Sequence, residues 1–256
     1  MESPAAGHDV RVSFLLGGAQ KAGTTSLDAW LREHPQVAMP HSRKELHFFD
    51  LDGNFAAATP TYADYHACFD AGASGIHGES TPAYMYFPAV PARVAAYNPE
   101  MKWILLLRDP ADRAFSHWNM MREAGAEPLD FMSALDAEPD RIADRADLER
   151  RRRYSYLDRG RYAEQIRRLW HHFDRSRTLV LRSEHLWQDP TAGLQRICRF
   201  LGVPWPDTPT ALQSAERGRY DAPISPQARE RIQRELESAN RELEQLLEID
   251  LSDWRR

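Results

Sequence analysis

Cysteine is scarce in this chain of 256 residues, which contains only Cys68 and Cys198, each in a segment with a helical pattern. Two such cysteines supply neither a disulfide framework nor a zinc site, and they suit a reducing compartment. No apolar run approaches the length of a membrane span, and residues 1–9 lack a basic stretch followed by an apolar core. We therefore expect a cytoplasmic protein without a membrane span.

An excess of basic residues is also missing. The 33 Lys and Arg stand against 38 Asp and Glu, giving a formal net charge of −5. Electrostatics therefore give no case for a nucleic-acid partner. The length is enough to bury a full core. We expect a disordered N-terminus over 1–10 and one domain over 11–256, while the oligomeric state cannot be deduced.

The sequence does contain a glycine-rich segment between an apolar run and a helical pattern. Residues 12–16 are typical of a buried strand, which Gly17 and Gly18 would end. Thr24 is a good N-cap for the helix that follows. Backbone N–H groups at a helix start, with Lys21 inside the loop, predict an anion site, most plainly for phosphate.

This segment is not a Walker A motif, which needs lysine directly after its second glycine. Here Thr24 follows Gly23, and Lys21 lies two residues before that glycine. This departure weakens the interpretation of the chain as a kinase or NTPase, which stays an alternative. An ordinary glycine-rich turn is the other alternative, and the lysine and the three hydroxyl residues after Gly23 argue against it.

Apolar runs alternate with helical patterns along the chain. The runs at 103–107 and 178–181 resemble 12–16, and 76–82 predicts a shorter strand that leads into a loop. Continuous apolar strands between helices are the signature of a parallel α/β sheet.

Ligands of such sheets bind beyond the carboxyl ends of the strands. This rule groups three polar strand exits, which are the loop at 17–26, the loop at 79–82, and Arg108 with Ser116. Asp109 and Pro110 are the expected cap and first residue of the helix that carries Ser116.

Two further polar segments have a functional and a plain interpretation. Glu45 and His47 lie beside two phenylalanines, which suggests a partly buried polar segment. The plain alternative is a solvated carboxylate paired with Arg43 or Lys44, and a histidine held by one hydrogen bond. The run Arg150–Arg153 is either a solvated helix face or a contact for an anionic acceptor.

Together these residues resemble the sulfotransferases that use 3′-phosphoadenosine-5′-phosphosulfate (PAPS), in particular the branch with the heparan sulfate sulfotransferases and their bacterial relatives. The resemblance covers about 14–254. The residues similar to the family's 5′-phosphosulfate loop are Lys21, Ala22, Gly23, Thr24, Thr25 and Ser26. Residues 107–116 resemble the 3′-phosphate segment, in which the Arg and the Ser hold the phosphate. A late loop that closes over the same phosphate is matched by Arg217, Gly218 and Arg219.

The resemblance implies an α/β fold of one domain, with a central parallel sheet flanked by helices, of the P-loop-kinase-like sulfotransferase type. It implies PAPS as donor, 3′,5′-adenosine bisphosphate (PAP) as product, and no metal. Residues 44–50 resemble the segment with the catalytic glutamate, so Glu45 would be the general base. Lys21 would stabilise the bridging oxygen, and His47 would orient the acceptor or tune Glu45.

The acceptor side is expected to include Phe48, Glu79, Tyr84 and Tyr86, with Ser80 standing where the family often has lysine. Aromatic walls beside a carboxylate suit a hydroxyl on a modest-sized molecule. The net negative charge, with no long basic groove expected apart from Arg150–Arg153, argues against a long polyanionic glycan. The paired cysteines and membrane anchor of the secreted animal enzymes are absent. We predict O-sulfation of a small or glycosylated metabolite. Alternatives are N- or O-sulfation of a polysaccharide, a kinase or NTPase, and a PAPS-binding protein without catalysis.

Overall fold

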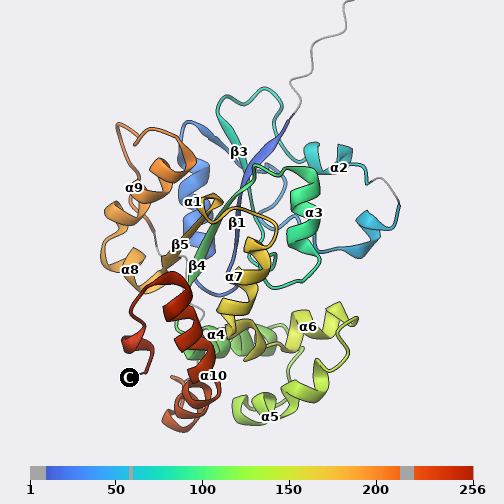
Figure 1. Cartoon of the computed structure of the whole chain (residues 1–256), viewed down its shortest axis with the longest axis vertical. Helices are drawn as coiled ribbons and strands as arrows, with labels where there is room; N and C mark the ends of the chain where they lie inside the picture. Colours follow the sequence, from blue (N-terminus) through green and yellow to red (C-terminus); the bar gives the residue numbers. More distant parts are fainter. Residues whose placement is uncertain (1–9, 58–59, 214–221, 256) are drawn as a thin grey trace, which may run out of the picture. The chain divides into compact units, whose positions relative to one another are not determined.

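One sheet of five strands stands in the computed structural model of the chain, which describes residues 10–57, 60–213 and 222–255. The strand order is β2-β3-β1-β4-β5 (Figure 1). β1 pairs in parallel with β3 and with β4, and β2 pairs in parallel with β3. The strands are β1 (Val12–Gly18), β2 (Val37–Ala38), β3 (Ile76–Ser80), β4 (Lys102–Leu107) and β5 (Thr178–Arg182). The predicted α/β fold with a central parallel sheet flanked by helices is confirmed.

Helices fill most of the chain between and after the strands. They are α1 (Thr24–Glu33), α2 (Ala63–His66), α3 (Val90–Tyr97), α4 (Pro110–Glu123), α5 (Phe131–Arg141), α6 (Leu148–Tyr154), α7 (Tyr162–Trp170), α8 (Ser183–Gln188), α9 (Pro190–Leu201) and α10 (Pro226–Leu247). Single turns of 3₁₀ helix are η1 (Asp52–Phe55), η2 (Asp158–Gly160), η3 (Arg175–Arg177) and η4 (Ser252–Arg255). In the described part of the chain, every helix is too short or too polar to cross a bilayer.

The chain divides into two compact units. The first unit comprises 1–19, 23–106 and 168–215, and it contains the sheet. The second unit comprises 20–22, 107–167 and 216–256. The single domain predicted over 11–256 stays a prediction, as does the disordered N-terminus, because residues 1–9 lie outside the described residues.

The core of the first unit is the central strand pair β1 and β4, whose side chains at Leu15, Leu16, Ile104 and Leu105 are fully buried. The structure corrects one expectation here, since β1 runs on to Gly18 instead of ending at Leu16. A Cβ atom at Gly17 would lie 2.6 Å from the ring of Trp103. These glycines therefore serve close packing inside the strand rather than its termination.

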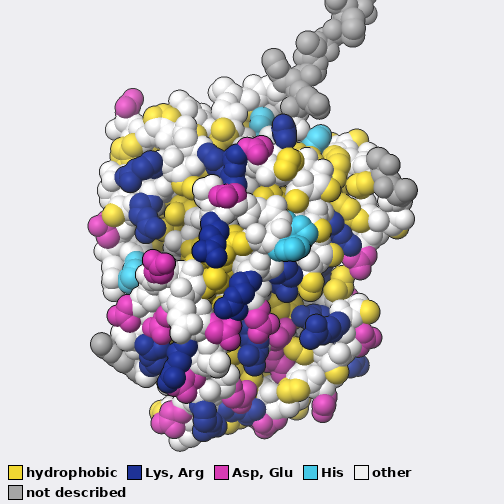
Figure 2. All heavy atoms as spheres, in the orientation of Figure 1, with side chains coloured by type: hydrophobic (Ala, Val, Ile, Leu, Met, Phe, Trp, Pro, Cys, Tyr) yellow, Lys and Arg dark blue, Asp and Glu magenta, His cyan; other side chains and the backbone are white. Residues whose placement is uncertain are grey.

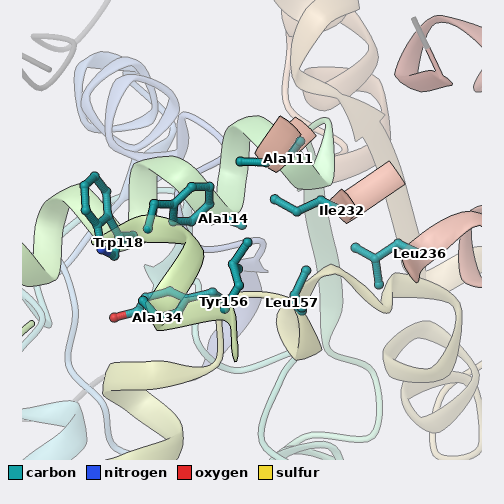
Figure 3. Packing of buried hydrophobic residues seen from close by; sticks show 11 residues of the cluster. Ala111, Ala114, Trp118, Ala134, Tyr156, Leu157, Ile232 and Leu236 are labelled. Atoms are coloured by element: carbon teal, nitrogen blue, oxygen red, sulfur yellow. The ribbon is translucent and has the colours of Figure 1, made fainter. Parts of the chain in front are cut away.

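The core of the second unit joins α4, α5 and α10 (Figure 3). Its buried members are Ala111, Ala114, Trp118, Phe131, Ala134, Leu135, Tyr156, Leu157, Ala228, Ile232 and Leu236. Helix α4 begins as predicted, with the Asp109 carboxylate accepting the N–H groups of Ala111 at 2.7 Å and Asp112 at 3.0 Å. The spacing of Ile232 and Leu236 places both on one face of α10, and each buried side chain contributes roughly 1.5–3 kcal/mol.

Candidate active site

The start of helix α1 presents the hydroxyl groups that follow the glycine-rich loop. The N-cap is Gly23, in the left-handed conformation at φ 96°, and Thr24 is the first helical residue rather than the predicted cap. Thr24 and Ser26 are buried, and Thr25 is exposed. A left-handed N-cap explains the glycine, because only glycine adopts this conformation without cost.

Lys44 connects these hydroxyls to the predicted base. Its Nζ lies 3.5 Å from Thr24 Oγ1, 3.3 Å from Thr25 Oγ1 and 3.1 Å from Glu45 Oε1. The sequence offered Arg43 and Lys44 as equal partners of Glu45. In the structure the partner is Lys44, while Arg43 donates to the Leu46 carbonyl at 3.1 Å.

His47 joins two carboxylates. Its Nε2 lies 3.4 Å from Glu45 Oε2, and its Nδ1 lies 2.9 Å from Asp50 Oδ2. Hydrogen bonds to Asp50 and then to Glu45 raise the pKa of His47 to about 9, so the ring is an imidazolium at neutral pH. Asp50 was not singled out in the sequence, although its position three residues after His47 is visible there.

The charge state of Glu45 follows from these neighbours. Burial acts to raise the pKa of Glu45, but the hydrogen bond from His47 and the charge of Lys44 outweigh it, so the pKa lies below its ordinary value. Glu45 is therefore a carboxylate at neutral pH, as a proton acceptor must be. Its oxygens are held from two sides, which fixes their direction.

A buried hydrogen-bond network centred on Glu79 holds the backbone of the segment at 45–50. The Glu79 carboxylate accepts hydrogen bonds from Tyr65 Oη at 2.7 Å, Thr81 Oγ1 at 2.6 Å and Tyr84 Oη at 2.8 Å. Tyr84 Oη in turn accepts the N–H groups of Phe48 at 2.9 Å and Phe49 at 3.3 Å. Burial raises the pKa of Glu79 to about 7.

Glu79, Tyr84, Tyr86 and Phe48 were predicted on the acceptor side. Glu79 and Tyr84 are fully buried, Tyr86 is 3% exposed and Phe48 is 8% exposed, with its ring stacked on Tyr65. In the structure, Glu79 and Tyr84 support the backbone of the segment at 45–50 through hydrogen bonds. Contact with an acceptor stays a prediction for all four.

The second unit contains Lys21, Arg108 and Ser116. Arg108 Nη1 donates to the Lys21 carbonyl at 3.1 Å, which ties the strand exit to the loop, and Tyr162 Oη donates to the Arg108 carbonyl at 2.9 Å. The backbone of Lys21 has a positive φ of 69°, a conformation that residues other than glycine rarely adopt. Ser116 lies on the second turn of α4 and is 3% exposed.

Further charged residues of the second unit lie near this group, and apart from the predicted cap Asp109 the sequence did not single them out. Arg229 from α10 pairs with Asp112 and lies 3.5 Å from Asp109. The pKa of the buried His117 is well below its ordinary value, first because of burial and then because of the charges of Arg159, Arg113 and Lys21.

Some predicted residues cannot be placed. Arg217, Gly218 and Arg219 lie outside the described residues. In the first unit the structure brings Thr24, Thr25 and Glu45 together with His47, and in the second it brings Lys21 to Arg108. Over 10–57, 60–213 and 222–255, His, Cys, Asp and Glu side chains form no group suited to a metal ion.

Comparison with known proteins identifies the class to which this fold and these residues correspond. A family model described as the sulfotransferase domain matches residues 12–217. The chain therefore belongs to the sulfotransferase family, and it is an enzyme of that class.

Individual relatives refine this picture. The crystal structure of a sulfotransferase from Alicyclobacillus acidocaldarius is 30% identical, with a TM-score of 0.80, over 96% of this chain and 100% of that one. The mouse bifunctional heparan sulfate N-deacetylase/N-sulfotransferase 3 is 29% identical over 197 residues, which are 74% of this chain and 22% of that protein. The chain thus spans about a fifth of the length of the curated relatives it matches. A sulfotransferase domain from the curacin biosynthetic pathway, 16% identical with a TM-score of 0.51 over 77% of this chain and 76% of that one, shares the fold.

Proposed function

We propose that this sulfotransferase moves a sulfuryl group from PAPS to a hydroxyl group, with Glu45 as the general base. The observation that carries the proposal is the contact chain of the first unit, in which Lys44 joins Glu45 to the hydroxyls of Thr24 and Thr25. A proton acceptor thus lies one side chain away from the helix start that resembles the phosphosulfate loop. Family membership supports a sulfuryl donor.

The reaction needs two functions from the protein. Donor binding is assigned to residues 21–26 for the 5′-phosphosulfate, and to Arg108, Ser116 and the loop at 217–219 for the 3′-phosphate. Arginine suits this role because its guanidinium makes forked contacts with phosphate. The acceptor hydroxyl then loses its proton to Glu45 as its oxygen attacks sulfur in line, and the sulfur–oxygen bond to the 5′-phosphate breaks. Lys21 is assigned to the bridging oxygen that receives the negative charge.

Calorimetry with PAP and AMP tests the donor. PAP should bind far better, because it adds the 3′-phosphate for which Arg108 and Ser116 are proposed. Replacing Arg108 with Ala should weaken PAP binding by roughly 1.5–3 kcal/mol, the scale of a charged hydrogen bond, and AMP binding much less. Equal affinity for PAP and AMP in the unmodified protein would exclude PAPS as donor.

For the acceptor we propose a modest-sized hydroxyl compound. The arginines of α6 are paired with local carboxylates. The distances are 3.5 Å from Arg150 Nε to Asp147 Oδ2, 3.2 Å from Arg151 Nη2 to Asp158 Oδ2, and 3.7 Å from Arg152 Nε to Glu149 Oε1. On the face drawn in Figure 2, basic and acidic side chains are interspersed. Along α6 and on that face, a long polyanion would therefore find little continuous positive surface.

A polysaccharide acceptor is the second candidate, and the heparan sulfate N-sulfotransferases among the relatives favour it. The two are separated by incubating the protein and radiolabelled PAPS with a panel of small hydroxyl compounds and with heparan-type chains, each with and without chelator. Mass spectrometry then locates the added sulfo group. Transfer to the chains alone would refute the small acceptor, and sulfo transfer that stops with chelator would contradict a reaction that needs no metal.

A further inference from the structure

Lys44 is a charged side chain at the candidate site that sequence reasoning assigned to no function. Its ammonium has three N–H donors, and three acceptors surround it, namely the Glu45 carboxylate and the Thr24 and Thr25 hydroxyls. The side chain is only 20% exposed, so the contacts are not those of a freely solvated lysine.

These partners differ in strength. Glu45 is an anion, whereas the two hydroxyls are neutral acceptors that lie 3.3 and 3.5 Å away, at the long end of hydrogen bonding. An anionic oxygen that arrived at the hydroxyls would be a better partner for the two N–H groups that now reach them. Lys44 can therefore accept such a ligand without giving up Glu45.

We propose that Lys44 couples the donor to the base, its ammonium binding a phosphosulfate oxygen of PAPS while it stays paired with Glu45. This role rests on the proposed function, in which Thr24 and Thr25 belong to the phosphosulfate loop. Lys44 would then act in addition to Lys21.

The shift of negative charge during the transfer explains why a cation between Glu45 and the donor would favour the reaction. The acceptor oxygen bonds to sulfur, its proton passes to Glu45, and the electron pair of the breaking sulfur–oxygen bond stays on the 5′-phosphate. Negative charge thus disappears from Glu45 as it appears on the phosphate. The ammonium of Lys44, in contact with both Glu45 and the phosphate, keeps an anionic partner at every stage of the transfer. The phosphate binds it more strongly in the transition state than in the ground state.

The test compares Lys44→Met with Lys44→Arg and with the matched control Arg43→Met, which removes a neighbouring charge that donates to the Leu46 carbonyl. Two measurements need no acceptor: calorimetry with PAPS, and carbon NMR titration of the Glu45 carboxylate. Lys44→Met should weaken PAPS binding by about ten- to hundredfold and move the Glu45 titration to higher pH. Lys44→Arg should keep most of the affinity, and Arg43→Met should change it less than about threefold.

The fold should survive each change, because the groups that Lys44 leaves behind include an exposed hydroxyl and a partly exposed carboxylate that water can reach. Thermal unfolding checks this. Unchanged PAPS affinity in Lys44→Met, or an equal loss in Arg43→Met, would overturn the role of Lys44 alone. An unmodified protein that binds neither PAPS nor PAP would overturn the proposed function and this role together.

Discussion

At the scale of single residues, His47 decides how the base is presented. Asp50 and Glu45 both attract its ring protons, so both nitrogens donate and the ring cannot serve as a second base at neutral pH. Of the two roles that the sequence allowed for His47, tuning Glu45 is the one that these contacts favour. The imidazolium of His47 contacts Glu45 Oε2, which restricts the rotation of the Glu45 carboxylate and so the direction of its other oxygen.

Replacing Glu45 with Gln should therefore lower kcat by roughly 10²–10⁴, because the amide cannot accept the acceptor's proton. PAP affinity should be nearly unchanged, since PAP carries no hydroxyl that is deprotonated in the reaction. Lys21→Ala is the contrasting variant, which should lower kcat and weaken donor binding together. Steady-state kinetics and calorimetry measure both. A Glu45→Gln protein with normal turnover would remove Glu45 from the role of base.

His47 also predicts a pH dependence of stability. Its pKa rises from 6.5 to about 9 in the folded protein, so the folded state holds this proton more tightly. The resulting stabilisation is complete below pH 6.5 and is lost as the pH rises through about 9. Thermal unfolding of the unmodified protein and of His47→Gln, measured from pH 6 to 10, should show a difference that shrinks over this range. A difference that grows with pH would contradict the assignment.

At the scale of elements, the segment at 45–50 has no regular secondary structure and depends on the residues that follow β3 for its shape. Two of its N–H groups meet the one oxygen of Tyr84, and the N–H of His47 lies 3.4 Å from Thr81 Oγ1. The backbone at His47 has a positive φ of 55°, a conformation that needs such external support.

Tyr84→Phe should lower the free energy of unfolding by about 3 kcal/mol, because each buried polar group left without a partner costs roughly 1–3 kcal/mol. It should also reduce kcat, since the segment with Glu45 loses its anchor, while PAP binding stays close to normal. Urea denaturation and kinetics measure these effects. Thr81→Ser keeps its hydroxyl and serves as the mild control. If Tyr84→Phe had normal kcat, Tyr84 would not position the base.

The elements differ in how far the sequence predicted them. Helix α4 begins where Asp109 with Pro110 indicated, because this signal is local. Helix α8 was missed, and it starts directly after β5 without a side-chain cap. The contacts of Tyr84 with Phe48 and Phe49 join residues 36 and 35 positions apart, which no local pattern encodes. The role of Glu45 as base came from the family resemblance, whereas coordinates were needed to choose Lys44 over Arg43 as its partner and to find Asp50 behind His47.

At the scale of the whole molecule, the donor product should stabilise the folded chain by mass action. PAP at a hundred times its dissociation constant contributes about 2.7 kcal/mol. For a chain of this size that corresponds to a rise in Tm of roughly 5–10 °C. AMP at the same concentration should raise Tm much less. Differential scanning fluorimetry measures both, and an equal rise with AMP would argue against a 3′-phosphate site.

The anchoring of the 45–50 segment through its backbone has a consequence for protein engineering. Tyr84 and Thr81 bind peptide N–H groups that every residue except proline possesses, so these hydrogen bonds place no demand on the side chains of residues 47–49. A library that varies position 48, but excludes proline and leaves Glu45, His47, Phe49, Glu79, Thr81 and Tyr84 intact, should retain a correctly placed base in many of its members. New acceptors are best sought in such a library, because its variation is separated from the parts that fix the proton acceptor.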